Sequence, residues 1–391
     1  MNRLAPYRLQ TNGATPRCCL IGEGCGAMGV ESPAYATHFP LNGVITMARQ
    51  GGPIKMAVVG LGRAGWDIHV RAIRGRKDFQ LVEAVDLETS RLEEARAEFH
   101  CHTFTDFKQF LRESRAELVV IATQSKDHAP MSIAALAAGK HVLTEKPMAV
   151  SLRETDRVIA AAEKSKGLFT VHQNARLTAD LLHIKQVMKS GVLGDIFMIK
   201  RGQYSYGRRR DWQVLRKYGG GNLLNNGVHA VDQVLQLLDS PVKDVFGDLQ
   251  RVLNPGDRED HVKVVIRAKS GMVADVEVST AVTISPYTWM LVGSRGTLIS
   301  DGKTSRLRYH TSKLPQLRPV DKHLVPSRAY DRVDKIEFVE KEMPTSAPSK
   351  RNFYDYLYDS IRRGKPLLVT PESVRQTMSV LQQARRGTPF R

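Results

Sequence analysis

Cysteine is scarce in this sequence, and its placement excludes a disulfide framework. The 391 residues contain four cysteines, of which Cys18, Cys19 and Cys25 lie close together and Cys101 lies far along the chain. A disulfide-rich secreted domain has more cysteines at regular spacings. No second Cys/His pair completes a zinc site, so we expect no metal. This cysteine usage is typical of the reducing cytoplasm, where we expect the protein to act.

Long apolar runs are also missing. No stretch reaches the roughly 18 apolar residues that a membrane-spanning helix needs. The first residues lack the charged segment and apolar core of a secretory signal. We therefore expect no membrane partner. The apolar fraction of 42% is ordinary for a globular protein, and 391 residues predict two or three domains.

Acidic residues are outnumbered by basic ones. The chain has 40 Asp and Glu against 58 Lys and Arg, which gives a formal net charge of +18. Such an excess raises the hypothesis of nucleic-acid binding, because Lys and Arg neutralise phosphates. The basic residues are spread along the whole chain, however, without a basic arm or an aromatic-rich single-strand motif. We favour a solvated basic surface that attracts anionic substrates, and we expect no nucleic-acid partner.

Residues 1–54 differ from the rest of the chain. They are rich in Gly, Pro, Ala and Thr, and their apolar residues show little periodicity. We predict a disordered extension here, or a start codon assigned too early, with Met47 or Met56 as the true first residue.

The next hundred residues alternate between strand and helix patterns. Short apolar runs occur at residues 55–59, 80–85, 117–122 and 141–144, and amphipathic segments occur around residues 65–74, 92–99, 107–114 and 131–138. Strands that are apolar throughout and alternate with helices predict a parallel sheet covered on both faces. We therefore predict an α/β fold, with a doubly wound (Rossmann) domain over residues 55–150.

Beyond residue 150 the pattern changes to helices and then to alternating strands. Two hairpins are predicted, one from residues 261–267 and 272–278 and one from residues 289–292 and 297–300. Helical patterns return at residues 353–362 and 371–385. We predict an α+β domain over residues 151–391 for substrate binding and oligomerisation, with an open, mainly antiparallel sheet. The last helices could pack back on the first domain.

A glycine-rich turn follows the first predicted strand and opens a helix. It consists of Gly60, Leu61, Gly62, Arg63, Ala64 and Gly65. In a dinucleotide-binding turn the first glycine permits the tight turn, and the second lets the backbone approach a pyrophosphate. The third lets the helix pack on the sheet, with its N-terminus toward the phosphates. We predict that this turn binds a dinucleotide.

Asp86 lies at the end of the second predicted strand, 21 residues after Gly65. This separation suits a carboxylate that accepts hydrogen bonds from the adenosine ribose. A carboxylate there also repels a 2′-phosphate, and neither Leu87 nor Glu88 is basic. We therefore expect NAD rather than NADP, with Arg63 and Arg91 as the residues that could reverse this preference.

Two further motifs carry chemistry. Glu145-Lys146-Pro147 follows the strand at residues 141–144, at the strand end where parallel sheets place ligands. A lysine with a lowered pKa can act there in proton transfer, although a surface lysine followed by a strand-ending proline explains the tripeptide equally well. After three glycines, Asn225, His229 and Asp232 recur at intervals of four and three. They are predicted to share one helix face and to line a site, because such polar groups are costly to bury without partners.

The order of these three motifs resembles that of the glucose-fructose oxidoreductase / inositol dehydrogenase / rhizopine catabolism (Gfo/Idh/MocA) family. The motifs are the glycine turn, Glu-Lys-Pro, and a glycine-led helix with the pattern G-x-H-x-x-D at residues 227–232. Residues 119–123 with His128, residues 137–142 and residues 353–357 also look like the family. The resemblance covers residues 55 to about 386.

The resemblance implies hydride transfer between a nicotinamide and a hydroxyl of a sugar, sugar acid or cyclitol. It implies that Lys146 and His229 form the acid/base pair beside Asn225, and that Thr123, His128 and Glu145 contribute with Lys146 to the cofactor site. Family members also suggest a cis peptide bond before Pro147 and a homodimer or homotetramer formed through the C-terminal sheet. Many members have Asp at the position of Asn225, so the proton relay is expected to be arranged differently here.

The segment at residues 204–212 is expected to form part of the pocket wall. Its tyrosines and Trp212 offer faces for sugar rings, and its arginines, Arg209 among them, can bind carboxylate or phosphate. An anionic sugar and a merely solvated arginine loop remain equal alternatives. Asn174 and His172, after the strand at residues 168–171, are further candidates for the pocket or for a structural role.

Three other functions remain open. The same fold can hold NAD permanently and run a redox-neutral glycosidase or epimerase cycle. It can also serve as a non-catalytic sensor of cofactor or sugar, although a sensor needs no acid/base pair such as Lys146 and His229. Nucleic-acid binding is the remaining hypothesis, and a steep salt dependence would be its sign.

Overall fold

The structure is a computed structural model that describes residues 52–314, 316, 335–345 and 349–390. The chain divides into two compact units, residues 1–48 and 49–391, and all described residues belong to the second. The predictions for the N-terminal extension, its three cysteines and Met47 lie outside the described residues. Within the described part, no helix is long and apolar enough to cross a membrane.

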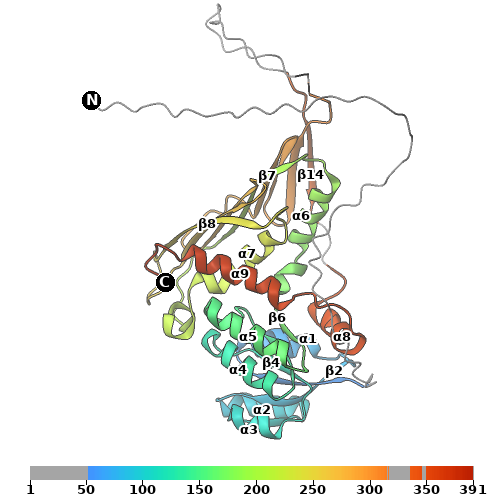
Figure 1. The fold of residues 1–391 in the computed structure, drawn as a ribbon, viewed down its shortest axis with the longest axis vertical. Coiled ribbons are helices and arrows are strands. Elements are labelled where there is room, and N and C mark those ends of the chain that lie inside the picture. Colours follow the sequence, from blue (N-terminus) through green and yellow to red (C-terminus); the bar gives the residue numbers. More distant parts are fainter. Residues whose placement is uncertain (1–51, 315, 317–334, 346–348, 391) are drawn as a thin grey trace, which may run out of the picture. The chain divides into compact units, whose positions relative to one another are not determined.

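The first half of the described chain forms a six-stranded, fully parallel sheet (Figure 1). Its strands are β1 (Ile54–Val59), β2 (Phe79–Val85), β3 (His102–Phe104), β4 (Leu118–Ile121), β5 (His141–Thr144) and β6 (Phe169–Val171). The strand order is β3-β2-β1-β4-β5-β6, so the order reverses between β1 and β4. The predicted doubly wound architecture is confirmed. Its sixth strand lies beyond residue 150, the predicted domain boundary.

Helices connect these strands. They are η1 (Ala64–Val70), continued by α1 (Arg71–Ile73), then α2 (Thr89–Phe99), α3 (Phe107–Glu113), α4 (Ser125–Ala137) and α5 (Leu152–Lys164). Two of them begin at side-chain caps, because Asp106 accepts a hydrogen bond from Gln109 N and Ser151 accepts one from Glu154 N. All four residues of β4 are buried, as the continuous apolar run predicts.

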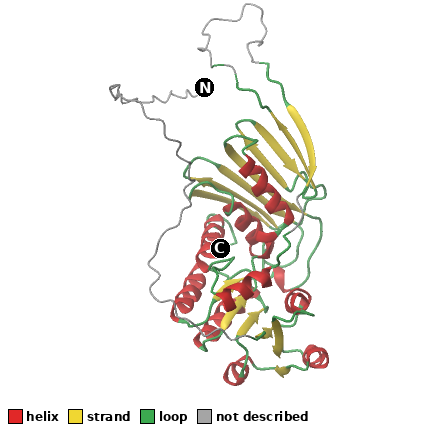
Figure 2. Ribbon diagram, turned by 90° about the vertical axis from the view of Figure 1, so that its right-hand side faces the viewer, coloured by secondary structure: helices red, strands yellow, loops and turns green. Residues whose placement is uncertain are grey.

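The second half contains an eight-stranded, mainly antiparallel sheet (Figure 2). Its strands are β7 (Ile196–Tyr204), β8 (Val242–Gln250), β9 (His261–Ala268), β10 (Val273–Ser279), β11 (Trp289–Gly293), β12 (Gly296–Ser300), β13 (Thr304–Tyr309) and β14 (Val339–Pro344). Among the pairings, only β7 with β10 is parallel in the described residues. In β9, buried Val262, Val264 and Ile266 alternate with more exposed residues. Both predicted hairpins and the open face are therefore present.

The remaining helical segments lie beyond β6 in the chain. They are η2 (Asn174–Leu177), α6 (Ala179–Ser190), η3 (Trp212–Val214), η4 (Arg216–Tyr218), η5 (Leu223–Gly227), α7 (Val228–Leu235), α8 (Phe353–Arg363) and α9 (Pro371–Ala384). Helix α9, coloured red in Figure 1, contacts α5 and β6 of the first half and α7 and β8 of the second. It thereby joins the two halves into one unit.

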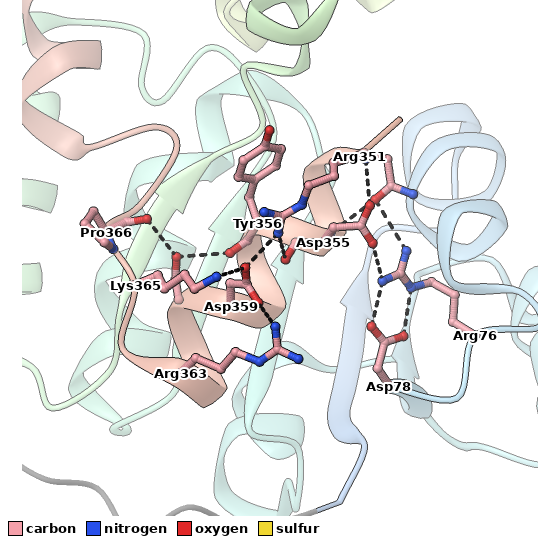
Figure 3. A network of polar contacts seen from close by, with 11 residues as sticks. Arg76, Asp78, Arg351, Asp355, Tyr356, Asp359, Arg363, Lys365 and Pro366 are labelled. Carbon is pink, nitrogen blue, oxygen red and sulfur yellow. Dashed lines mark hydrogen bonds and ion pairs between the residues drawn. The ribbon is translucent and has the colours of Figure 1, made fainter. Parts of the chain in front are cut away.

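Helix α8 is fastened to the parallel sheet by a polar network (Figure 3). Arg76, next to β2, forms two hydrogen bonds with Asp78, at 2.8 and 2.6 Å, and a third at 2.7 Å with Asp355 of α8. Tyr354 of the same helix packs edge-on against Phe79 of β2, with ring centroids 5.1 Å apart. The Tyr354 side chain is thus held in the interior of the first half.

The other end of α8 has its own ion-pair cluster, also drawn in Figure 3. Asp359 accepts hydrogen bonds from Arg351, Arg363 and Lys365 at 2.7–2.9 Å. The three cations hold the pKa of Asp359 at about 2, because hydrogen bonds from Lys365 and Arg351 favour its charged form. The cluster fixes the C-terminal turns of α8 and the segment that follows them.

Candidate active site

The predicted site residues gather at one edge of the parallel sheet. Parallel strands all end at the same edge, so residues that follow different strands meet there. Gly60 follows β1, Asp86 follows β2, Thr123 lies two residues beyond β4, Glu145 follows β5, and His172 follows β6. The sequence places these residues far apart, and strand order brings them together.

The glycine turn has the shape that a dinucleotide pyrophosphate needs. Gly60 has φ +90°, and a Cβ atom there would lie 2.7 Å from the carbonyl oxygen of Ala122. A Cβ on Gly65 would collide with the carbonyl oxygen of Gly60. Gly62 by contrast has no atom within 4 Å of its Cβ position, so its backbone faces open space. The first and third glycines are required by packing, and the second leaves room for a ligand.

Asp86 lies beside this turn and holds it. Its carboxylate accepts hydrogen bonds from the backbone N–H of Leu61 at 2.6 Å and of Glu88 at 2.9 Å. Arg91 of α2 lies 3.5 Å from the same carboxylate. The placement fits recognition of an adenosine ribose by Asp86, with Arg91 as the basic residue next to this carboxylate.

Two cavities meet at Lys146. The larger has a volume of about 700 Å³, and its lining includes Asn174, Arg209, His172, His229 and Glu259. The smaller, of about 80 Å³, lies on the side of the glycine turn, and its lining includes Ala64, Thr123, His128 and Trp212. Both are lined by Arg63, Ile68, Glu145, Lys146, Gln213 and Asn225. Ala64, Thr123 and His128 of the predicted cofactor residues therefore lie at the smaller cavity, and Asn174, Arg209 and His229 of the predicted substrate residues lie at the larger one.

A third cavity, of about 480 Å³, lies at α9. Its lining is mainly apolar, with Leu224, Met378 and Leu381, and it contains none of the predicted site residues. The candidate active site is therefore the pair of cavities at Lys146.

Lys146 is held by oxygen atoms of Asn225. Its Nζ donates hydrogen bonds to the Asn225 carbonyl oxygen at 2.8 Å and to Oδ1 at 3.3 Å. Burial lowers the pKa of Lys146; the negative charge of Glu145 opposes this shift, and the positive charges of Arg63 and Arg209 add to it. The peptide bond between Lys146 and Pro147 is cis, as the resemblance implies.

A π-helix positions Asn225. The segment η5 (Leu223–Gly227) is a π-helix that passes directly into α7. Such wider turns change the usual helical pairing and occur often at functional sites. Glu259 caps the segment, because its Oε1 accepts a hydrogen bond from Leu223 N at 3.1 Å. The three glycines before it indicate an irregular start, but nothing in the sequence specified a π-turn.

His229 lies one turn after Asn225 in the wall of the larger cavity. Burial, together with the nearby charge of Lys146, lowers the pKa of His229 to about 3. Its Nδ1 is buried and has no hydrogen-bond partner in the described part of the chain. His229 is therefore neutral at ordinary pH, and no carboxylate orients its ring.

Asp232 differs from the prediction that it would line the site with Asn225 and His229. Its carboxylate is buried and forms two hydrogen bonds with Arg176 of η2, at 2.8 and 2.7 Å, and a third with Thr377 of α9 at 3.0 Å. The prediction assumed one regular helix from residue 225 to 232. His229 and Asp232 both lie in α7, but the Asp232 side chain is directed toward η2 and α9, where it meets Arg176 and Thr377.

The segment at residues 204–212 is divided between several environments. Arg208, Arg209 and Arg210 are exposed and line the larger cavity. The tyrosines do not contribute to the lining of either cavity. Tyr204 packs edge-on against Tyr287, and Tyr206 is exposed. Alternation along the extended chain explains this, since Ser205 and Gly207 face the cavity. Trp212 lies on the cofactor side rather than among the predicted substrate residues.

His128 joins the ends of two strands. Its Nδ1 lies 2.7 Å from the Pro147 carbonyl oxygen, and its Nε2 lies 3.2 Å from that of Thr123. Burial lowers the pKa of His128, although both contacts oppose this shift. The contact with Pro147 thus helps to fix the Lys146–Pro147 segment.

The sequence analysis did not predict three residues at the site, which are Glu259, His69 and Tyr354. Glu259 is buried in the wall of the larger cavity, where burial raises its pKa. His69 of η1 and Tyr354 of α8 form a buried cluster with Glu145 and His172. Nothing in the local sequence around these residues indicates a site, because their partners come from distant elements.

Comparison with known proteins agrees with this geometry. Residues 54–173 match the oxidoreductase family with an NAD-binding Rossmann fold, and residues 181–299 match the GFO/IDH/MocA C-terminal domain. The chain belongs to the Gfo/Idh/MocA family. Members of this oxidoreductase family share the two-part architecture described above, so the resemblance in the sequence is confirmed.

Several relatives span most of the chain. The uncharacterized oxidoreductase YhhX of Escherichia coli K12 is 27% identical over 84% of this chain and 95% of its own. The scyllo-inositol 2-dehydrogenase (NADP(+)) IolW of Bacillus subtilis is 26% identical over 85% of this chain and 92% of its own. Among solved structures, an NAD-binding protein from Listeria innocua has a TM-score of 0.72 and 26% identity, covering 85% of this chain and 94% of its own.

Proposed function

We propose that this member of the Gfo/Idh/MocA family is an NAD-dependent dehydrogenase that transfers a hydride between nicotinamide and a hydroxyl of a sugar, sugar acid or cyclitol. One observation carries the proposal. Lys146 lies where a cavity beside the glycine turn meets a larger, polar cavity, and Asn225 and His229 lie next to it. The relative IolW, a scyllo-inositol 2-dehydrogenase, supports a substrate of the cyclitol class.

The chain's own residues have distinct tasks in this reaction. Gly60 and Gly65 would shape the turn, Gly62 would let the backbone approach the pyrophosphate, and Asp86 would hold the adenosine ribose. The bound nicotinamide supplies the hydride acceptor or donor. Lys146 and His229, as the acid/base pair, hold the reacting hydroxyl by hydrogen bonds, and the lowered pKa of Lys146 brings it closer to proton exchange at neutral pH.

An anionic substrate is the second part of the proposal. Arg63, Arg208, Arg209 and Arg210 line the larger cavity, and Asp211 is the acidic residue of the same loop. Arginine forks bind carboxylate or phosphate in a bidentate manner. This concentration of positive charge favours a sugar acid or a phosphorylated sugar over a neutral sugar.

The test is a screen for NADH formation against neutral sugars, uronates, sugar phosphates and cyclitols. We expect turnover with at least one of these classes and none in Lys146→Ala. Arg209→Ala is expected to raise KM for acidic substrates about tenfold and to leave neutral ones unchanged. An unchanged KM in Arg208→Ala, Arg209→Ala and Arg210→Ala would exclude the anionic class. Mass spectrometry that finds retained NAD in a protein without net NADH production would favour the redox-neutral alternative.

A further inference from the structure

Gln213 of η3 lines both cavities of the candidate active site, as Lys146 and Asn225 do. Its Oε1 accepts a hydrogen bond from Nδ2 of Asn225 at 3.3 Å. Asn225 in turn accepts a hydrogen bond at Oδ1 from Nζ of Lys146, also at 3.3 Å, in addition to the 2.8 Å contact at its carbonyl oxygen. A chain of hydrogen bonds therefore runs from Lys146 through Asn225 to Gln213.

The backbone of Gln213 is held by the glycines that precede η5. The Gln213 carbonyl oxygen accepts a hydrogen bond from Gly221 N–H at 2.8 Å, and the Gln213 N–H donates to Oδ1 of Asp211 at 2.9 Å. A Cβ atom on Gly220 would lie 2.5 Å from the same carbonyl oxygen, so a larger residue would push the two segments apart. The glycine run thus fixes Gln213 against the segment that carries Asn225.

Lys146 determines the direction of the hydrogen-bond chain. An ammonium group only donates, so the side-chain atom of Asn225 that faces Lys146 is the oxygen. The nitrogen of the Asn225 amide then faces Gln213, whose own oxygen accepts from it. The Nε2 group of Gln213 is left over, and no hydrogen bond from it exists among the described residues. The chain therefore ends in an N–H donor at the place where the two cavities meet.

A ligand that pairs with this donor must present an acceptor. Gln213 is only half-buried, so its amide is accessible to a ligand. Carboxylate, ionised phosphate and carbonyl oxygens are acceptors only, whereas a hydroxyl also donates. The larger cavity is lined by four arginines, namely Arg63, Arg208, Arg209 and Arg210. Their positive charge favours an anionic oxygen among these acceptors.

We propose that Nε2 of Gln213 donates a hydrogen bond to an anionic oxygen of the substrate, in a carboxylate or a phosphate group. This inference rests on the proposed dehydrogenase function and names a residue that determines its substrate specificity. Lys146 and His229 keep the acid/base role, and Gln213 takes no part in proton transfer. Because the same side chain orients Asn225, it also fixes the oxygen that holds Lys146.

Two substitutions separate the two contacts of Gln213. In Gln213→Glu an oxygen still accepts from Asn225, but no N–H remains for the substrate. In Gln213→Met both contacts are lost, while the length of the side chain is kept. We expect KM to rise at least tenfold in both variants and kcat to fall at least tenfold only in Gln213→Met. A KM within threefold of wild type in either variant would overturn the proposal.

Two controls separate the hydrogen bond from other effects of substitution. Asn254→Asp adds the same charge to the larger cavity and keeps an oxygen for the backbone N–H of Arg209, which donates to Asn254 at 2.6 Å. We expect its KM to rise less than threefold. A rise as large as that in Gln213→Glu, with an unchanged KM in Gln213→Met, would assign the effect to charge and overturn the proposal. Gln109→Met, at an exposed glutamine of α3, should keep full activity.

Ligand binding without turnover gives a further readout. In protein saturated with NADH, which cannot oxidise a hydroxyl, the NMR signal of the Gln213 side-chain amide is assigned by its absence from Gln213→Met. We expect glucuronate or glucose 6-phosphate to shift the amide proton signal, and glucose at the same concentration to leave it unchanged. The probe that shifts the signal distinguishes a carboxylate from a phosphate. No shift with either anionic probe, or an equal shift with glucose, would overturn the proposal.

These experiments distinguish failure of this inference from failure of the proposed function. If no polyol is oxidised but the Gln213 amide responds to an anionic probe, the dehydrogenase function is wrong and the anion contact stands. If a polyol is oxidised with an unchanged KM in both Gln213 variants, the anion contact is wrong and the dehydrogenase function stands.

Discussion

At the residue scale, Asp86 has a structural role in the glycine turn and is also the residue that we predict to determine cofactor preference. Its carboxylate accepts a hydrogen bond from Leu61 N–H within the glycine turn, and Arg91 lies 3.5 Å from it. The sequence predicted its place because strand length and the spacing from Gly65 put it at the end of β2. It could not predict that Arg91 would lie against the carboxylate.

Asp86→Ser is expected to change the cofactor preference. The change removes the charge that repels a 2′-phosphate and leaves Arg91 free to bind one. We expect the ratio of kcat/KM for NADP to that for NAD to rise at least 30-fold, measured with the same substrate. Asp86→Ser combined with Arg91→Ala is the control and should lose most of the gain. A wild-type enzyme that already prefers NADP would contradict the assignment of NAD.

His229 should make the protein sensitive to acid. Its pKa is lowered from 6.5 to about 3 by burial, so the unfolded chain binds a proton at higher pH than the folded chain does. The free energy of unfolding therefore falls as pH drops from about 6.5 to about 3, by on the order of 5 kcal/mol in total. In urea unfolding at pH 7 and pH 4.5, His229→Gln should lose about 2 kcal/mol less than wild type between the two pH values. Equal losses would show that His229 is protonated in the folded protein.

At the element scale, neighbouring helices decide which of three similarly spaced residues of η5 and α7 reach the larger cavity. Asn225 and His229 line it, whereas Asp232 pairs with Arg176 and Thr377. Residue spacing alone could not show this, because Arg176 lies 56 residues before Asp232 in the sequence and reaches it only through the packing of η2 against α7.

Asp232→Asn is expected to destabilise the fold rather than to affect chemistry directly. It leaves the buried guanidinium of Arg176 without its carboxylate, which costs about 3–5 kcal/mol. Chemical denaturation should show this loss of stability, and KM should change little in the fraction that remains folded. Arg375→Ala, which breaks an exposed ion pair with Asp156, is the control and should cost less than about 1 kcal/mol. A fully stable Asp232→Asn with a large loss of kcat would assign Asp232 to the active site after all.

At the scale of the whole molecule, the open face of the eight-stranded sheet is a candidate for self-association. Phe246 of β8 is 64% exposed and pairs across the sheet with Val265 of β9, whose side chain is partly exposed on the same face. Exposed apolar side chains on a sheet face often mark an interface. This feature supports the predicted homodimer or homotetramer.

Phe246→Glu should weaken such an assembly, because it places a charge within an apolar contact. We expect sedimentation velocity to show a dimer or tetramer for the wild type and a shift toward monomer for the variant. Phe197→Glu, at the exposed start of β7, provides a comparison at another exposed phenylalanine. A wild-type monomer at micromolar concentration would contradict the prediction.

Local sequence patterns predicted many of the strands and turns of this protein. Strand burial, hairpin turns and the glycine turn depend on neighbouring residues, so β1, β5, the β9–β10 hairpin and the places of Gly60, Asp86 and Lys146 follow from the chain alone. Two strands, β3 and β14, depend on pairing with their neighbours rather than on a local pattern. The places of Tyr204 and Tyr206 depend on which face of the chain is covered by other elements. Residues 315, 317–334 and 346–348 lie outside the described residues.

The sequence by itself predicted a dinucleotide site from the glycine turn, and the order of the glycine turn, the Glu-Lys-Pro motif and the histidine helix predicted an oxidoreductase through the resemblance to the Gfo/Idh/MocA family. Which polar groups become partners is a different matter. Glu145, His172, His69 and Tyr354 come from four elements separated by up to 285 residues, and only the closing of β5 and β6 against η1 and α8 brings them within hydrogen-bond distance. Burial then gives these contacts their effect, since a carboxylate enclosed by two imidazoles keeps its charge where an isolated one would not.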